Sequence, residues 1–460
     1  MMKKHYRIFA LLAFASLPLA SCDKEIVGIS QKPTTDKEID PKLVYKRPTT
    51  AKEISLVENL GKVTTIFKEL YQTKANLNVV NAAINSRTYT DESVLLKDLI
   101  YPEGSLVTDN PRFKAYARKH NLSLTSFASS FWAIANKAND QAFLNFLNSL
   151  KPADSATATK GKAKGALTTD ADGVSVYFPY SQQFMIPYEE EGGGGEYSYG
   201  PVTSLVTATA DADAGYGYQP YTDSYGVTQY QTVVVDDDFA YNNPTHIIGL
   251  NGIEPYSEPT TSNSTAFEPT GPIVLPGATR EIKQVYVGEV RCTHQFDALI
   301  SFTDNGGGSE IRFTRADGVL KIADGQVQAD VYSGGSTINR YNIRKKRWVT
   351  FGQEWDSDWE STNNNENLAT FEDDNRNEFT LTGSISTTLT FSPGNTGTGT
   401  IGFEKVFRGD DRLERQHNLV RDSFFALNRI DLEGEMINRW PARDRSARIS
   451  YTLWDRTYTR

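Results

Sequence analysis

The sequence predicts an α+β multidomain protein, in which an N-terminal helical bundle is followed by mainly antiparallel β domains, the last of them a β-sandwich. Apolar residues recur at helical spacing between residues 50 and 150. After residue 173, β-branched and aromatic residues alternate with polar ones instead. Polar stretches separate these regions, and 460 residues are enough for several domains of ordinary size.

The first 21 residues predict a cleavable signal peptide. Lys3, Lys4 and Arg7 precede an apolar run over residues 8–20, and small residues then lead to Cys22. The alternative, an uncleaved membrane anchor, is disfavoured because this run is shorter than the ~20 residues that a span requires. A cysteine at this point is what bacterial lipoprotein processing needs, so we expect lipid on Cys22 to anchor the chain to a membrane.

The sequence after the anchor, Cys22-Asp23-Lys24-Glu25, resembles the start of mature surface lipoproteins from Bacteroidota. This resemblance implies a lipid-anchored protein of the cell envelope, at the outer membrane or the cell surface. In enteric bacteria an aspartate directly after the cysteine would instead imply retention at the inner membrane, so the leaflet stays open. Residues 31–36 hold few apolar groups and a proline, and we expect residues 22–49 to form a flexible tether.

Charge and cysteine content narrow the function further. The net charge is −9, and removal of the basic signal makes the mature chain more acidic. An acidic chain disfavours nucleic acid as a partner and disfavours electrostatic binding to anionic headgroups. Cys22 and Cys292 are the only cysteines, so a lipid on Cys22 leaves no internal disulfide. We interpret Cys292 as a small core side chain and not as a nucleophile.

Residues 50–150 predict the helical domain. Thr50 and Glu53 form a capping box, in which each side chain accepts a hydrogen bond from the backbone of the other. The first predicted apolar stripe consists of Leu56, Leu60, Val63, Phe67 and Leu70. A second long helix is predicted from about Ser123, with a stripe of Phe127, Phe131, Ile134, Ala138, Ala142 and Phe146. We interpret both stripes as the core of a small bundle; the alternative is a docking surface for a partner.

The remaining boundaries follow from composition. Residues 151–172 are small and polar and predict a linker, and residues 173–253 predict a β-rich domain. Residues 254–280 contain five prolines among Ser, Thr and Gly and predict a second linker. Residues 281–460 predict the sandwich. Its expected strands are residues 285–290, 298–302, 311–313, 327–332, 348–351, 368–371, 379–385, 398–403 and 447–453.

Acidic loops in this last region are candidates for calcium binding. The order of residues 355–374, with aspartates, a strand and then an acidic turn, resembles C2-type sandwiches, which implies calcium held between loops. The candidate ligands are Asp304, Asp356, Asp358, Glu372, Asp373 and Asp374. Calcium takes six to eight oxygens, so several of them would have to converge. The favoured alternative is that these acids are solvated turns. The acids at 211–213 and 236–238 are comparable, and neither cluster has EF-hand spacing.

Catalytic signatures are few. The mature histidines are His120, His246, His294 and His417, and none has zinc-site spacing. The basic run over residues 342–348 could bind lipopolysaccharide phosphates. We favour the alternative that its Lys and Arg side chains lie at the edge of a sheet and prevent pairing with another chain. We therefore expect a non-enzymatic binding, adhesion or assembly protein, with a protein or glycan ligand stacking on tyrosines such as those in residues 216–221. The alternative function is a carboxylate-dependent hydrolase that acts on a surface polymer.

Overall fold

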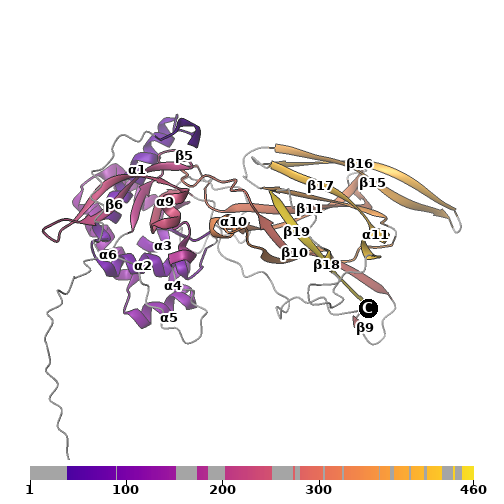
Figure 1. Cartoon of the computed structure of the whole chain (residues 1–460), viewed down its shortest axis with the longest axis horizontal. Coiled ribbons are helices and arrows are strands. Elements are labelled where there is room, and N and C mark those ends of the chain that lie inside the picture. The colour runs from indigo at the N-terminus through magenta and orange to yellow at the C-terminus, as the bar shows by residue number, and fades with distance from the viewer. Residues whose placement is uncertain are drawn as a thin grey trace, which may run out of the picture.

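The structure, a computed structural model, places an N-terminal part of helices and one sheet beside a C-terminal part made mainly of sheets (Figure 1). The predicted mixture of helices and antiparallel sheets is thereby confirmed. The described residues are 39–89, 91–151, 173–184, 203–250, 273–274, 280–303, 306–323, 326–361, 363–372, 378–392, 395–408, 412–426, 439–440 and 448–459. The signal peptide, Cys22 and nearly all of both linkers lie outside them.

The first long helix forms as predicted. Helix α1 spans Ala51–Leu70, and its capping box is present: Thr50 Oγ1 accepts from Glu53 N at 3.2 Å, while Glu53 Oε2 accepts from Thr50 N at 3.0 Å. All five residues of the predicted stripe are buried. Local spacing and capping were sufficient to predict this helix, because both signals lie within the helix itself and do not depend on tertiary contacts.

The second predicted long helix is wrong in its extent, because it divides into α6 (Leu124–Lys137) and α7 (Gln141–Ser149). Asn139 between them adopts a left-handed φ of 50°, and Asp140 caps α7. The break shifts the apolar face, so that Ala138 and Ala142 of the predicted stripe are exposed. The other helices of the N-terminal part are η1 (Pro41–Leu43), α2 (Lys74–Asn85), α3 (Leu96–Ile100), α4 (Leu106–Asp109), α5 (Pro111–His120), α8 (Ser181–Phe184) and α9 (Asp237–Asn242).

A six-stranded sheet completes the N-terminal part. Its order is β2-β3-β8-β4-β6-β7, with β4 and β8 parallel and the other neighbours antiparallel. Its strands are β2 (Ser93–Leu95), β3 (Val174–Tyr177), β4 (Ser204–Thr207), β6 (Ala214–Thr222), β7 (Thr228–Asp236) and β8 (Thr245–Leu250). A short pair, β1 (Val44–Lys46) and β5 (Asp211–Ala212), lies beside it. One hydrophobic cluster joins residues of α1–α7 to this sheet.

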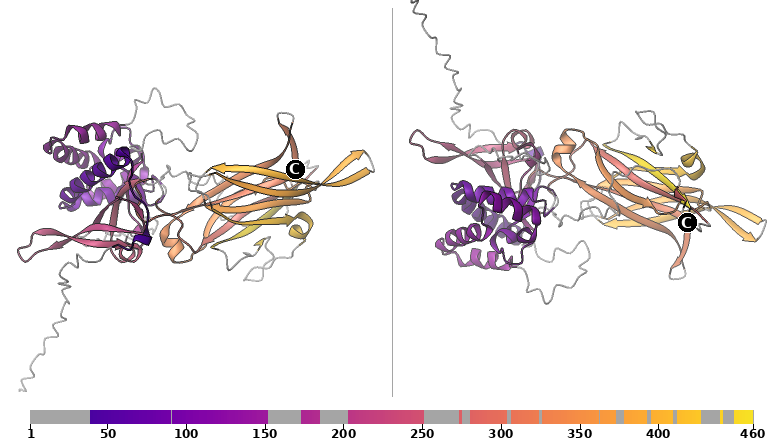
Figure 2. Two further views of the ribbon diagram at one scale, coloured as in Figure 1. Left: turned by 90° about the horizontal axis from the view of Figure 1, so that it is seen from above. Right: turned by 90° about the horizontal axis from the view of Figure 1, so that it is seen from below.

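Two larger sheets build the C-terminal part. One has the order β13-β10-β19-β18, with β9 pairing with β19, and the other has the order β12-β11-β14-β17. Their strands are β9 (Ile273–Val274), β10 (Glu281–Cys292), β11 (Ser309–Ala323), β12 (Gln326–Ile338), β13 (Val349–Asp356), β14 (Asn365–Glu372), β17 (Arg412–Val420), β18 (Arg439–Trp440) and β19 (Ile449–Thr459). A long hairpin, β15 (Glu378–Ser392) and β16 (Asn395–Arg408), extends from them (Figure 2).

A second hydrophobic cluster contains residues from both of these sheets, among them Val287 of β10, Phe313 of β11 and Leu453 of β19. Cys292 is buried in it, as predicted, and donates to the carbonyl of His294. Eight of the nine predicted strands fall within or overlap observed strands; residues 298–302 instead form only isolated bridges. Within the described residues, no helix combines the length and the apolar composition needed to cross a bilayer.

Candidate metal centre at the junction of the two parts

The segment 297–303 is a polypeptide bridge between the two parts. Ile300 and Ala212 exchange two backbone hydrogen bonds of 2.9 Å, and Leu250 N donates to Ser301 O at 2.9 Å. Leu299, Ile300 and Phe302 belong to the N-terminal hydrophobic cluster. The chain therefore leaves β10 of the C-terminal part, packs briefly against the N-terminal core and returns to β11. Asp297 stands at the beginning of this segment.

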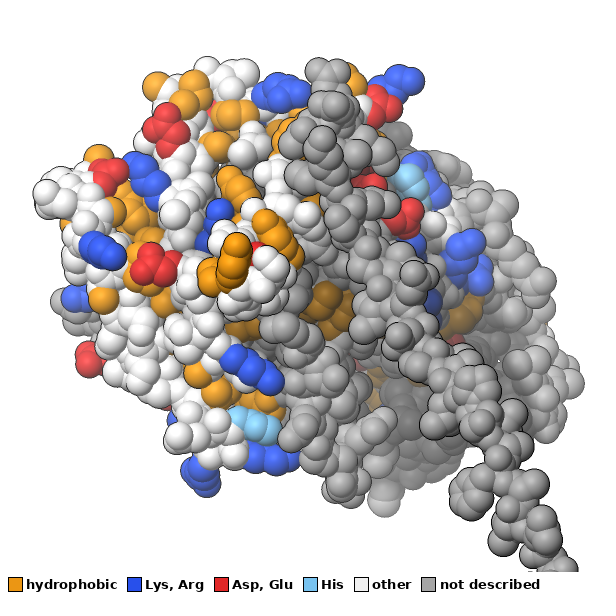
Figure 3. All heavy atoms as spheres, turned by 60° about the vertical axis from the view of Figure 1, so that its left-hand side comes forward, with side chains coloured by type: hydrophobic (Ala, Val, Ile, Leu, Met, Phe, Trp, Pro, Cys, Tyr) orange, Lys and Arg blue, Asp and Glu red, His pale blue; other side chains and the backbone are white. Residues whose placement is uncertain are grey.

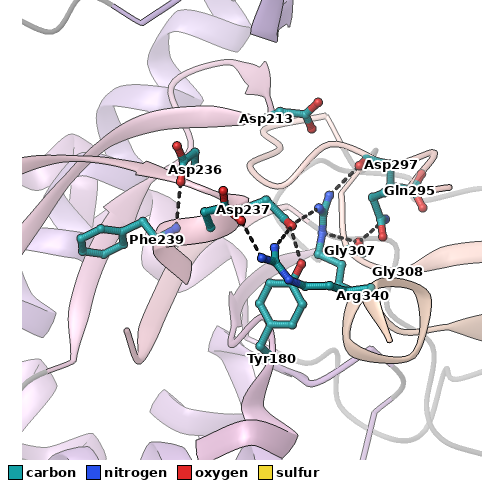
Figure 4. Close-up of polar contacts among 12 residues, drawn as sticks. Tyr180, Asp213, Asp236, Asp237, Phe239, Gln295, Asp297, Gly307, Gly308 and Arg340 are labelled. Carbon is teal, nitrogen blue, oxygen red and sulfur yellow. Dashed lines mark hydrogen bonds and ion pairs between the residues drawn. The ribbon is translucent and has the colours of Figure 1, made fainter. Parts of the chain in front are cut away.

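Arg340, the first residue of α10 (Arg340–Arg344), links the same segment to α9. Its guanidinium is 2% exposed and donates to Gly307 O at 2.9 Å, Asp237 Oδ1 at 3.0 Å and Asp297 O at 2.5 Å (Figure 4). Charge-assisted hydrogen bonds of this kind are stronger than neutral ones, particularly when they are buried. Asp237 comes from the N-terminal part and the two carbonyls from the C-terminal half, so one side chain joins both.

Three carboxylates converge next to this arginine: Asp297, Glu310 on β11 and Glu372 at the end of β14. One oxygen from each lies within 4.8 Å of the others. Asp297 is 3% and Glu372 is 0% exposed. Asp297 also connects the cluster to Arg340, because its carboxylate belongs to the cluster while its carbonyl accepts from the guanidinium. We call these three residues the acidic triad.

The electrostatics of the acidic triad oppose full ionisation. Burial, followed by the charges of Asp297 and Glu372, raises the pKa of Glu310 well above its usual value. Asp91 adds a further negative charge from the N-terminal part: its Oδ1 accepts from Gly308 N at 2.8 Å, and burial raises its pKa also. Gly307 must lack a side chain here, because a Cβ would lie 1.8 Å from Asp91 Oδ2 and its φ is 123°.

Of the three predicted calcium ligands that the structure describes, Asp356, Asp358 and Glu372, only Glu372 belongs to this triad. Asp356 is buried and pairs with Arg315 at 2.8 Å, and it also accepts from Asp358 N at 2.8 Å. Asp358 pairs with Arg280 on the surface. These two acids are therefore occupied by cations of the chain itself. The remaining candidates, Asp304, Asp373 and Asp374, lie outside the described residues.

The acids at 211–213 and 236–238 accept hydrogen bonds from the protein itself, some local and some from distant segments. Asp211 accepts from the Ser301 hydroxyl and from Phe302 N, both at 2.9 Å. Asp236 caps α9 by accepting from Phe239 N at 2.8 Å. Asp237 is the acid of this group that pairs with Arg340. The cap formed by Asp236 is the local turn bond that the interpretation of acidic turns expects, whereas the bonds of Asp211 and Asp237 join segments far apart in the sequence.

Sequence reasoning missed Asp297 and Glu310 as members of the triad. They belong to different loops and strand ends, and no local spacing relates them to Glu372, so only the tertiary fold brings them together. Arg340 was missed as well, because it precedes the basic run and carries no motif. Within the described residues, no other group of three His, Cys, Asp or Glu side chains has metal-binding geometry.

A separate surface feature is the β6–β7 hairpin, which projects from the N-terminal part (Figures 1 and 2). Tyr216, Tyr218 and Tyr221 on it are 50%, 38% and 45% exposed, and Tyr225 in its turn is 89% exposed. Figure 3, which brings this end forward, shows exposed hydrophobic side chains among scattered charges. Two hydrogen bonds close the turn, in which Asp223 Oδ1 accepts from the backbone N of residues 225 and 227, both at 2.9 Å. The predicted tyrosines are thus presented to solvent.

Comparisons of this chain with protein-family models, with curated proteins and with solved structures find no match.

Proposed function

We propose that this chain is a lipid-anchored, non-enzymatic binding or assembly protein of the cell envelope, in which a divalent cation, calcium, stabilises the junction of its two parts. The observation that carries the calcium proposal is the convergence of Asp297, Glu310 and Glu372. The location rests on the predicted signal peptide, on Cys22 and on the acidic residues that follow it.

The size of the acidic triad supports calcium. Calcium binds oxygens at 2.3–2.6 Å, so two ligands on opposite sides of the ion are about 4.6–5.2 Å apart. The triad oxygens lie within 4.8 Å of one another, which fits inside that span. Without a cation, two buried carboxylates beside Glu310 would repel one another, and one or more would have to be protonated at neutral pH.

Thermal unfolding tests this proposal, because the effect of a triad substitution on the melting temperature should depend on whether calcium is present. With calcium removed by a chelator, Glu372→Gln should leave the melting temperature unchanged or raise it, because the substitution removes repulsion. With calcium at 100 times its dissociation constant, the unsubstituted protein should gain about 2.7 kcal/mol and the variant should gain far less. Asp297→Asn should behave as Glu372→Gln does.

Asp422→Asn is the matched control, since Asp422 is 96% exposed and carries the same charge. It should retain the full response to calcium. A parent protein whose melting temperature does not respond to millimolar calcium would contradict the proposal, and so would an undiminished response in Glu372→Gln. Magnesium in place of calcium measures the selectivity of the site for the larger ion.

The burial of the triad favours the non-enzymatic function over the hydrolase. A carboxylate that attacks or protonates a glycosidic bond must reach a polymer, and a pair of such acids faces the substrate from two sides. Asp297 and Glu372 are instead 3% and 0% exposed. A hydrolase would be supported by release of reducing sugar from an envelope polysaccharide that Glu372→Gln abolishes.

The β6–β7 hairpin is the surface that we propose for a protein or glycan ligand. Tyrosine offers a flat apolar ring with a polar hydroxyl, which suits both classes of ligand. Affinity electrophoresis in gels that contain soluble polysaccharides tests whether the ligand is a glycan. The parent protein is compared with a Tyr216→Ala/Tyr218→Ala variant. Retardation that the variant loses supports it, and equal mobility of both proteins in every gel contradicts it.

We also infer the finer architecture that the sequence predicts. The shared cluster of residues from β10, β11 and β19 supports a β-sandwich over residues 281–460. Contacts of buried residues in α1, such as Phe67, with Phe127 and Phe131 of α6 support a helical bundle. Hydrogen exchange would test this, because each core should then protect its own set of amides.

A further inference from the structure

We propose that Lys345, Lys346, Arg347 and Trp348, here called the basic turn, form a docking surface for the phosphate headgroups of the membrane on which the protein is anchored. The basic turn connects α10 to β13. It comprises the last four residues of the basic run over residues 342–348, for which the sequence favoured a strand edge protected by Lys and Arg. The structure places it before the edge strand β13, on a helix C-terminus and the turn that follows. This inference rests on the proposed envelope location.

The cations of the basic turn are not neutralised by the protein. Arg344, the residue before it, pairs with Asp237 at 2.9 Å and Asp238 at 2.6 Å. Lys345, Lys346 and Arg347 are exposed, and none of the ion pairs among the described residues includes them. In a protein with a net charge of −9, three adjacent unpaired cations are a local reversal of sign.

Aromatic rings accompany these charges. Lys345 Nζ lies 5.0 Å from the ring centroid of Tyr241, and the Arg347 guanidinium lies 4.9 Å from that of Tyr341, both within cation–π range. Trp348 is 37% exposed, and Arg291 lies 5.0 Å from its ring centroid. Tryptophan beside Lys and Arg is the combination that membrane interfaces favour, because the indole ring suits the headgroup region while the cations bind phosphate.

Lys346 occupies a left-handed backbone position of the basic turn, where glycine would be the preferred residue. Lys346 has a φ of 52°, Lys346 N donates to Ile343 O at 3.0 Å, and Arg347 N donates to Asn342 O at 2.9 Å. These two hydrogen bonds define a Schellman motif with Lys346 at its left-handed position, which glycine normally occupies. The chain therefore accepts conformational strain at the position that carries the central charge.

The acidic net charge does not prevent this binding. Charges more than about 8–10 Å apart at physiological ionic strength are largely screened, so a membrane surface in contact with the basic turn senses mainly that turn. A lipid anchor also holds the protein close to the bilayer, where a weak contact is enough to fix its orientation. Membrane headgroups fit better than a soluble anion, because the exposed indole adds an apolar contact that a free phosphate could not use.

Vesicle sedimentation tests the proposal with the mature chain from residue 22, in which Cys22→Ser prevents acylation. The probes are phosphatidylcholine vesicles with and without phosphatidylglycerol. We expect binding only to the anionic vesicles, decreasing as salt rises. A Lys345→Glu/Lys346→Glu/Arg347→Glu variant should bind at least tenfold more weakly. A Lys74→Glu/Arg118→Glu/Lys119→Glu variant, with the same charge change at exposed sites elsewhere, should lose much less.

Lys346→Gly separates binding from folding. Glycine relieves the left-handed strain, so this variant should melt at the same or a higher temperature while binding anionic vesicles more weakly. The proposal is overturned if the parent chain binds both vesicle types equally or neither, if the two triple variants lose binding to the same extent, or if Lys346→Gly binds as tightly as the parent. None of these results depends on whether the acidic triad binds calcium.

Discussion

Replacing Arg340 by methionine is the sharpest test of how the two parts are held together. The substitution preserves most of the side-chain volume but removes three charge-assisted hydrogen bonds, to Gly307 O, Asp237 Oδ1 and Asp297 O. Hydrogen bonds to charged groups contribute about 1.5–3 kcal/mol each. The Asp237 side chain is 39% exposed, so water can replace its bond, and the two backbone carbonyls account for most of the loss. We expect a destabilisation of about 3–5 kcal/mol.

Arg344→Met is the matched control, because Arg344 pairs with the same Asp237 but its side chain is 31% exposed. It should cost less than about 1 kcal/mol. Urea denaturation followed by tryptophan fluorescence measures both variants, since Trp355 and Trp359 are buried in the C-terminal cluster and Trp132 packs on the N-terminal one. Equal destabilisation by the two substitutions, or a loss below about 1 kcal/mol in Arg340→Met, would refute the reasoning.

Two further predictions concern the cores. His246 is fully buried, its Nδ1 lies 2.6 Å from the Tyr71 hydroxyl, and burial lowers its pKa to about 3. Its stabilising effect is therefore present above its unfolded pKa of about 6.5 and is lost as pH falls towards 3; between pH 7 and 5 this loss is about 2 kcal/mol. His246→Asn should remove that dependence, measured as the difference in unfolding free energy between variant and parent, whereas a parallel pH profile would contradict it. Gly288→Ala places a Cβ 2.2 Å from the Trp454 ring and should cost about 1–3 kcal/mol in the same urea assay. An unchanged midpoint would show that Trp454 moves aside without cost.

The elements that the sequence predicted well are those whose signals are local. The capping box of Thr50 and the apolar stripe of α1 lie within one helix, so propensity and tertiary packing agree. The break between α6 and α7 was missed because alanines at 138 and 142 continue the spacing of the stripe, although they are too small to show which face is buried. Strand β17 was missed because Arg412–Val420 is mostly polar, and its pairing with β14 comes from outside the segment.

The candidate site was predicted only at Glu372, and the reason is physical. Carboxylates carry no periodicity, and a metal site is defined by oxygens that meet in space. Among 57 acidic residues, those in visible clusters were the natural candidates, yet clustered acids such as Asp356 and Asp358 pair with arginines close by. Of the acids that do converge, Asp297 and Glu310 have no acidic neighbour in the sequence, so nothing local groups either of them with Glu372.

The junction therefore differs in kind from the parts that it joins. Each part has its own hydrophobic cluster, whereas the side chains that meet around Arg340 and Asp297 are mainly charged or polar. Hydrophobic contact is tolerant of direction, but hydrogen bonds to a buried guanidinium are not, so the polar junction fixes the relative placement of the two parts. Its strength also depends on ionisation. Glu310 and Glu372 lie beside the Asp297 carboxylate, and the Asp297 carbonyl accepts from Arg340, so a change in the charge of the acidic triad occurs one residue's length from the hydrogen bonds that join the two parts.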